Sequence, residues 1–195
     1  MLRVMISYRN LPGQRDFAYE LTQVLHDADI ETWIDVEDIP RGDATFDIVV
    51  SRWCAHHYPK IRQAAAEIAR VLKPGGTFLL IDSIVPPDAR LDTFINTLET
   101  LRDTGHVRNY AIREWLDFLE TVGLHGQVLR EWGLRLDGDD WVERIKTPAV
   151  LVDAIRALLV EAPDDLREAI RITGEDDSAG WGFDLPTALI KATKI

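Results

Sequence analysis

A run of side chains that could take part in chemistry follows one short apolar segment of this sequence. The apolar segment is residues 46–50, and the side chains that follow it are Ser51, Arg52, Trp53, Cys54, His56 and His57. Histidine has a reference pKa of about 6.5, so His57 could accept a proton from a hydroxyl group or an acidic carbon at neutral pH. We therefore predict a ligand site here, with His57 as the candidate general base.

Two other kinds of chemistry at this segment have less support. His56 and His57 could bind zinc, but neighbouring side chains in an extended segment point in different directions. No cysteine or carboxylate pattern at ligand spacing accompanies them, so we predict no metal site. Cys54 could be a nucleophile, but nothing readable from the sequence indicates an activated thiol, and free cysteines are usually buried. We interpret Cys54 as a packing residue.

The elements that must position these residues are two strands and a helix. Residues 46–50 and 77–81 have the apolar composition of buried strands. Between them, Ala64, Ile68, Val71 and Leu72 recur at helical spacing. The unit is a strand, helix and strand with a right-handed crossover, so the two strands should be parallel. Ligands bind beyond the carboxyl ends of such strands, which places residues 51–58 at the mouth of a site.

Further elements lie on both sides of this unit. An amphipathic helix is predicted over residues 14–28, between strands at 2–8 and 30–36. Beyond residue 82 the apolar spacing predicts a series of helices and two more strands. The helices are expected over residues 91–101, 111–122, 140–146, 148–160 and 163–170, and the strands over 128–136 and 183–193. This alternation of strands and helices indicates an α/β fold.

Composition narrows the classes of partner. The chain has 195 residues, enough for one domain with or without an appendage, and its net charge is −11. Such a charge disfavours nucleic acid or an anionic membrane as the partner of the whole surface. The single cysteine, the lack of a long apolar run and an N-terminus unlike a signal peptide predict a cytoplasmic protein.

From residue 34 onward the sequence resembles the C-terminal part of class I S-adenosylmethionine-dependent methyltransferases of the ubiquinone/menaquinone-biosynthesis type. The motifs that carry the resemblance occur in the order of the family. They are DVEDIP at 35–40, TFDIVVSR at 45–52, HHYP at 56–59, RVLKPGG at 70–76, LRD at 101–103, HVRNY at 106–110, WVER at 141–144 and FDLPTAL at 183–189.

The resemblance implies a fold and a set of roles. The fold would be a mostly parallel, Rossmann-like sheet, truncated or rebuilt at its N-terminal side, with a helical cap at 88–124 and an antiparallel C-terminal strand pair. The domain would span 34–195. S-adenosylmethionine would be the cofactor, and a small organic molecule would be the methyl acceptor. The cofactor would contact Asp35, Val36, Ser51, Arg52, Trp53 and His56. The acceptor would contact Arg102, His106 and Tyr110.

Each of these roles has a simpler alternative. Asp35 could be a solvated carboxylate at a strand end in an acidic protein. Surface ion pairs would explain Arg102 and its neighbours equally well. The sequence also departs from the family, because it has no G-x-G-x-G segment before Asp35. Only 34 residues precede Asp35, whereas two strand and helix units with a third strand need about 60. The hypothesis therefore covers an active methyltransferase and a relative that has lost cofactor binding.

Residues 1–42 resemble the start of a TIR domain. The resemblance rests on VMISYR at 4–9 and WIDVEDIPRG at 33–42, and SRWC at 51–54 is similar to a further TIR segment. A TIR enzyme that cleaves NAD would have a glutamate three residues after Cys54, where this chain has His57. We therefore rank NAD hydrolysis last. The alternative to a methyltransferase is a non-catalytic TIR-like module that self-associates, which would make the protein a homodimer.

Overall fold

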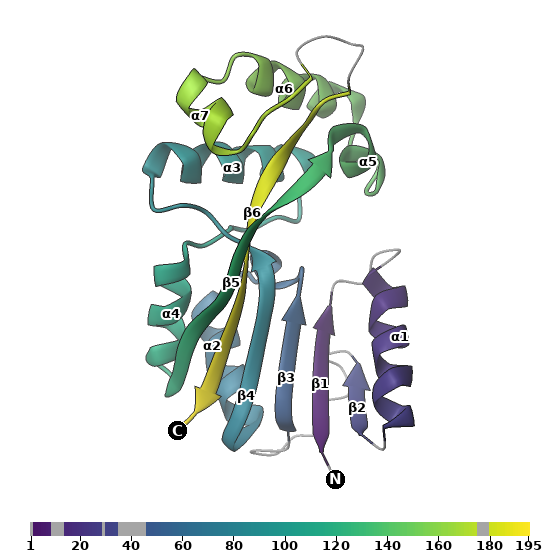
Figure 1. The fold of residues 1–195 in the computed structure, drawn as a ribbon, viewed down its shortest axis with the longest axis vertical. Coiled ribbons are helices and arrows are strands. Elements are labelled where there is room, and N and C mark those ends of the chain that lie inside the picture. The colour runs from purple at the N-terminus through teal and green to yellow at the C-terminus, as the bar shows by residue number, and fades with distance from the viewer. Residues whose placement is uncertain (1, 9–13, 29, 35–45, 175–179) are drawn as a thin grey trace. The chain divides into compact units, whose positions relative to one another are not determined.

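The computed structural model describes residues 2–8, 14–28, 30–34, 46–174 and 180–195, and their main feature is a six-stranded sheet (Figure 1). The strands are β1 (Arg3–Tyr8), β2 (Glu31–Ile34), β3 (Phe46–Arg52), β4 (Leu72–Ser83), β5 (Leu124–Asp137) and β6 (Gly182–Lys194). The helices are α1 (Gln14–Asp27), α2 (Ile61–Val71), α3 (Ala89–Arg102), α4 (Ile112–Glu120), α5 (Gly138–Glu143), α6 (Ala149–Val160) and α7 (Asp164–Ala169).

The strand order is β2-β1-β3-β4-β6-β5. β1 pairs in parallel with β2 and with β3, and β3 pairs in parallel with β4. β5 and β6 form the antiparallel pair at the C-terminal side (Figure 1). The predicted fold class is therefore confirmed, and so are the types of the predicted strands and helices within the described residues.

The sheet contains the point at which the strand order reverses. In a doubly wound sheet of order 3-2-1-4-5-6, ligands bind where the chain leaves the first strand in opposite directions. Here that point lies between β1 and β3, because β2 flanks β1 on the other side. In the part of the chain that the structure describes, no strand lies beyond β2. The described strands therefore include the point at which the strand order reverses.

The chain forms two compact units. The first unit is Met1–Asp82, Ile112–Arg130 and Ala188–Ile195, and the second is Ser83–Ala111 and Glu131–Thr187. Of the range 88–124 that the sequence assigns to a cap, residues 88–111 belong to the second unit and 112–124 to the first. The segment boundaries 1–42 and 34–195 stay predictions.

In the first unit, β1 presents alternate residues to two helices, as strand geometry requires. Val4 and Ile6 pack against Ala18 of α1. Met5 and Ser7 point to the opposite face, where they and α2 line a cavity.

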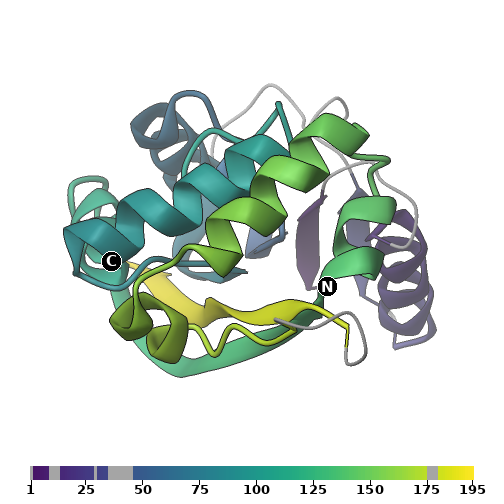
Figure 2. The same ribbon diagram turned by 90° about the horizontal axis from the view of Figure 1, so that it is seen from above.

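In the second unit, α3 and α6 lie side by side (Figure 2) over a core that includes Ile95, Leu98 and Ile155. Trp141 of α5 packs edge-on against Phe183, with ring centroids 5.0 Å apart. Each unit therefore has apolar packing of its own.

Three local features show how the sequence ends, begins or bends an element. The glycine pair Gly75-Gly76 lies in a bulge inside β4, because Phe46 pairs with Leu72 but Ile48 pairs with Thr77. Gly75 in this bulge has φ of 76°, which favours glycine. The acidic segment 137–140 is a helix start, with the Asp137 side chain accepting a hydrogen bond from the Asp140 amide. Gly123 follows α4 with φ of 76°, the left-handed conformation in which glycine commonly caps the end of a helix.

Candidate functional site

The centre of the site is a buried carboxylate at the carboxyl end of β4. Asp82 is 1% exposed. One of its oxygens accepts hydrogen bonds from the backbone amides of Cys54 (3.2 Å) and Ala55 (2.7 Å). The other oxygen lies 2.5 Å from Nδ1 of His56. A buried charge needs such partners, and the three contacts tie the segment after β3 to the end of β4.

The contact with Asp82 determines which nitrogen of His56 is basic. An ionised carboxylate can only accept hydrogen bonds, so Nδ1 of His56 carries the proton that is donated to Asp82. The lone pair of the neutral ring is then on Nε2. The His56 side chain is 11% exposed, and its ring lies against that of His57 with centroids 4.1 Å apart. The carboxylate of Asp82 therefore fixes the orientation of the His56 ring, with Nε2 as its basic nitrogen.

Backbone geometry brings this segment back over the strand ends. Trp53 has φ of 51°, in the left-handed region, and its amide donates to the carbonyl of Ile81. A 3-10 turn at Ala55–His57 follows. The change of direction at Trp53 turns the amides of Cys54 and Ala55 toward Asp82. The guanidinium of Arg52 lies 6.0 Å from the Trp53 ring centroid, and burial lowers the pKa of Arg52.

Three hydroxyl groups form a second cluster in the first unit. Ser7 of β1 and Ser51 of β3 are register partners, and the Tyr58 hydroxyl lies 3.2 Å from the Ser7 hydroxyl and 3.3 Å from the Ser51 hydroxyl. The Cys54 sulfur lies 3.6 Å from the Ser7 hydroxyl. Burial raises the pKa of Tyr58 far above its usual value, so its phenol is neutral at physiological pH.

The structure therefore brings several predicted cofactor residues to one place. Ser51, Arg52, Trp53 and His56 all lie at the carboxyl end of β3 or just after it. Asp35 and Val36 lie outside the described residues. The sequence places Tyr58 in the segment 51–58 at the mouth of the site, but it did not identify Ser7 and Asp82 as site residues. The available signal was position, since Ser7 and Asp82 end strands on either side of β3 in a parallel sheet.

The predicted acceptor residues lie in the second unit, where His106 belongs to a buried polar network. His106 is 8% exposed, and its Nε2 lies 3.0 Å from Oδ1 of Asn96 on α3. The same Asn96 oxygen accepts a hydrogen bond from the Asn109 amide at 2.7 Å. Oδ1 of Asn109 accepts from the Ser83 hydroxyl at 2.5 Å. The network fixes the loop around His106 to α3.

Arg102 and Tyr110 make other contacts in the same unit. Nε of Arg102 donates to the carbonyl of Trp141, and its guanidinium lies 5.0 Å from the Trp141 ring centroid. The ring of Tyr110 lies 5.5 Å from the guanidinium of Arg108, which pairs with Asp92. Arg102 thus holds α3 to α5, and its role toward an acceptor stays a prediction.

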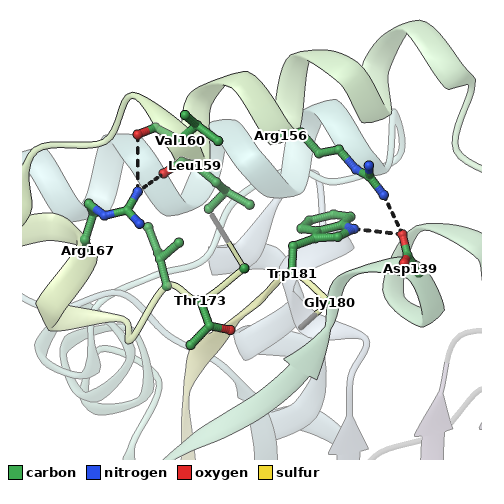
Figure 3. A pocket seen from close by; sticks show the side chains of 10 residues that line it. Asp139, Arg156, Leu159, Val160, Arg167, Thr173, Gly180 and Trp181 are labelled. Carbon is green, nitrogen blue, oxygen red and sulfur yellow. Dashed lines mark hydrogen bonds and ion pairs between the residues drawn. The ribbon is translucent and has the colours of Figure 1, made fainter. Parts of the chain in front are cut away.

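A separate cavity of about 180 Å³ in the second unit has charged walls (Figure 3). Asp139 accepts hydrogen bonds from the Trp181 indole and from Arg156, each at 2.7 Å, and the Arg156 guanidinium stacks on the Trp181 ring. Arg167 donates to the carbonyls of Leu159 and Val160 at the end of α6. These contacts stabilise the end of α6 and the start of β6.

The described residues contain neither a cluster of metal-ligating side chains nor a membrane-spanning helix. In those residues, no group of three or more histidine, cysteine, aspartate or glutamate side chains could hold a metal ion. None of the helices described is both long enough and apolar enough to cross a membrane.

Comparison with known proteins points to one family. The family model described as a methyltransferase domain matches residues 16–80. The chain is 38% identical over 158 residues to the uncharacterized methyltransferase YcgJ of Bacillus subtilis, an alignment that covers 81% of this chain and 62% of YcgJ. It is 42% identical over 131 residues to the uncharacterized protein YafE of Escherichia coli, covering 67% of this chain and 63% of YafE. The chain thus spans less than two thirds of the length of these relatives.

Solved structures show the same relationship. The crystal structure of YcgJ superposes with a TM-score of 0.84 at 30% identity, covering 99% of this chain and 92% of that one. The fold is also that of geranyl diphosphate C-methyltransferase from Streptomyces coelicolor, solved with S-adenosyl-L-homocysteine (TM-score 0.52, 13% identity, 100% and 72% covered).

Proposed function

Because this chain belongs to the class I S-adenosylmethionine-dependent methyltransferase family, we propose that it methylates a small organic acceptor and that His56 removes the acceptor's proton. The observation that carries the proposal is the contact of His56 Nδ1 with the buried carboxylate of Asp82. In this arrangement Nε2 accepts the proton while the carboxylate stabilises the imidazolium that forms, the division of labour known from other histidine and aspartate pairs. A hydroxyl acceptor gains most, since it is a weak nucleophile until it is deprotonated.

The residues at the strand ends fit the cofactor by their chemistry. S-adenosylmethionine, when bound, supplies an electrophilic methyl group on a sulfonium. At the end of β3, the half-buried Arg52 offers a cation for its carboxylate, and Trp53 offers an aromatic face for its adenine ring. The retained reversal point between β1 and β3 is where such a sheet binds ligands. Asp35, implied by the resemblance for the ribose, belongs to the same proposal.

The glycine-rich loop is the missing element of this fit. β1 ends in Ser7 and Tyr8, and the only glycine before α1 is Gly13. In a relative with the glycine-rich loop, backbone amides can approach the cofactor closely, so we expect weaker cofactor binding by this chain.

The deciding experiment is isothermal titration of the full chain with S-adenosylmethionine and with S-adenosylhomocysteine. Binding of either ligand, followed by transfer of a labelled methyl group to a panel of alcohols, phenols and amines, supports the proposal. No heat at millimolar ligand would contradict the active-enzyme proposal and favour a relative that has lost the cofactor.

The finer parts of the hypothesis are proposals as well. We propose that the acceptor contacts His106 and Tyr110, with Arg102 in support, and that the protein acts in the cytoplasm. The ubiquinone/menaquinone type and the TIR-like module remain predictions, to which the methyltransferase matches above lend no support. Light scattering over a range of concentrations tests the module, since a strictly monomeric protein would rule out self-association and the homodimer.

A further inference from the structure

The first unit contains a cavity that shares one lining residue, Ser51, with the predicted cofactor contacts and has no other part in the methyltransferase proposal. Its volume is about 240 Å³, and it lies between the sheet and α2. The walls are largely apolar and are formed by Met5 of β1, Val49 of β3, and Ala64, Ile68 and Val71 of α2. A cavity of about 150 Å³ with such walls is enough to hold a benzene molecule. The space is therefore large enough for a single aromatic ring with a substituent.

One end of this cavity is polar. The hydroxyl-bearing residues Ser7, Ser51 and Tyr58 line it, and Ser7 and Ser51 are 6% and 0% exposed. The distances from the Tyr58 oxygen to the two serine oxygens, 3.2 and 3.3 Å, are longer than the usual 2.7 to 2.8 Å for hydroxyl pairs. Each hydroxyl has one proton and two lone pairs, so three hydroxyls in loose contact can still donate to and accept from a further group.

The charge of the lining restricts the ligand class. The charged lining residue is Glu67, an exposed residue that pairs with Arg70 at 2.8 Å. No arginine, lysine or histidine is among the lining residues that the structure describes, so an anion would lose its hydration without gaining a cation. A cation would lose its hydration against the apolar walls. An uncharged ligand is favoured.

We propose that this cavity is a binding site for a small uncharged molecule of the phenol class, with an aromatic body and one hydroxyl group. The ring lies between Met5, Val49 and Ile68, and the hydroxyl joins the cluster of Ser7, Ser51 and Tyr58. The neutral Tyr58 phenol can act as donor or acceptor toward it. This site does not require the cofactor, so it stands apart from the proposed methyl transfer.

The test uses the full chain and four probes: phenol, toluene, benzoate and benzylamine. Binding is followed by ligand-observed NMR and by titration to millimolar concentration. We expect phenol to bind best, toluene to bind more weakly, and the two charged probes not to bind. Tyr58→Phe should weaken phenol binding about five- to tenfold and leave toluene unchanged, since it removes one hydrogen-bonding group and no apolar wall.

Ala64→Phe should abolish the binding of phenol and toluene, because the new ring fills the cavity from α2. Ala66→Phe is the matched control, since it makes the same change at an exposed position of the same helix and should preserve both affinities. Circular dichroism identifies any variant that fails to fold, and the Tyr58→Phe result then decides.

Three results would overturn the proposal. One is the absence of saturable phenol binding at millimolar concentration. Another is equal phenol affinity in Ala64→Phe and Ala66→Phe. The third is mutually exclusive binding of phenol and S-adenosylhomocysteine, which would make the cavity part of the cofactor site. Failure of S-adenosylhomocysteine to bind leaves the phenol result standing, so the two proposals fail separately.

Discussion

Each unit of this protein has a largely buried histidine whose ring contacts a side-chain oxygen, and the two oxygens differ in charge. His56 contacts the carboxylate of Asp82, whereas His106 contacts the amide oxygen of Asn96. Both contacts fix the orientation of a ring, but only the carboxylate can stabilise the positive charge that appears when the ring takes a proton. The difference teaches that the partner of His56 suits the proton transfer proposed for it, whereas the partner of His106 suits fixed positioning. The following variants test this difference between the two histidines.

The largest effect is expected from His56→Gln. This change removes the proposed base, so kcat should fall about 10²- to 10⁴-fold while the affinity for S-adenosylhomocysteine changes little. Steady-state kinetics and titration measure the two quantities. His57→Gln is the control and should lose less than about tenfold in kcat. Equal losses of kcat in both variants would contradict the assignment of the base to His56 and would favour His57, the candidate that the sequence alone predicts.

Asp82→Asn comes next and tests the charged partner. The buried carboxylate accepts two backbone amides and contacts His56, so we expect the free energy of unfolding to fall by about 2–4 kcal/mol. Urea unfolding measures it. Asp88→Asn is the matched control, because exposed Asp88 also accepts two backbone amides, those of Arg90 and Leu91. Asparagine caps helices as well as aspartate does, so the control should change by only a few tenths of a kcal/mol. Similar losses in the two variants would contradict the special position of Asp82.

Asn96→Ala tests the neutral partner and should have a smaller effect. It leaves Nε2 of His106 and the Asn109 amide without their shared acceptor, at a cost of about 1–3 kcal/mol in the free energy of unfolding. If His106 contacts the methyl acceptor, the KM for that substrate should rise while kcat stays within a few-fold of the wild-type value. Thr97→Ala, at an exposed position one residue further along α3, is the control. A fall in kcat as large as that of His56→Gln would remove the distinction between the two histidines.

The smallest effect is expected from Asp47, whose contacts with Lys73 and Arg3 lie outside the surroundings of His56 and His106. A hydrogen bond from Lys73 holds the pKa of Asp47 below its usual 3.8, as does the donated amide of Arg3. A lowered pKa means that the contribution to stability is complete above the unfolded-state value and is lost as the pH falls through the folded-state value. Asp47→Asn should therefore cost less than about 1 kcal/mol at pH 7, and the difference from the wild type should vanish at lower pH. Unfolding at pH 7 and at pH 2 to 3 measures this, and a difference that grows in acid would show that the sign is wrong.

Much of the fold could be predicted from local pattern. The alternation and apolar runs of β1, β3 and β6, and the helical spacing of α2 and α3, depend on neighbours in sequence. The position of β1 between β2 and β3 could not be predicted, because strand order depends on hydrogen bonds between segments that are far apart in the sequence. The sequence alone does not distinguish the bulge at Gly75 from a turn, since a glycine pair is common to both.

The candidate site was predictable only where one segment supplies it. Residues 51–56 follow a single strand, and their gathering is visible from the sequence. Asp82 is 26 positions away from His56, and nothing in the sequence says which of the two adjacent histidines faces it. That choice depends on the turn at Trp53, whose positive φ has no sequence signal because tryptophan rarely adopts it.

The bulge in β4 also has a consequence for how this segment can change in evolution. Asp82 and Ser83 are adjacent, so their side chains leave the strand on opposite sides, one to the His56 segment and the other to Asn109. The length of the segment 73–76 determines toward which face of the sheet Asp82 and Ser83 each point. Loss or gain of a single codon in a paired part of the strand would exchange the two side chains, whereas the irregular glycine segment can absorb length changes locally. Insertions and deletions should therefore be tolerated in the bulge. Residues 77–83 must keep their number, because one residue more or less would move Asp82 and Ser83 to the opposite faces of the strand.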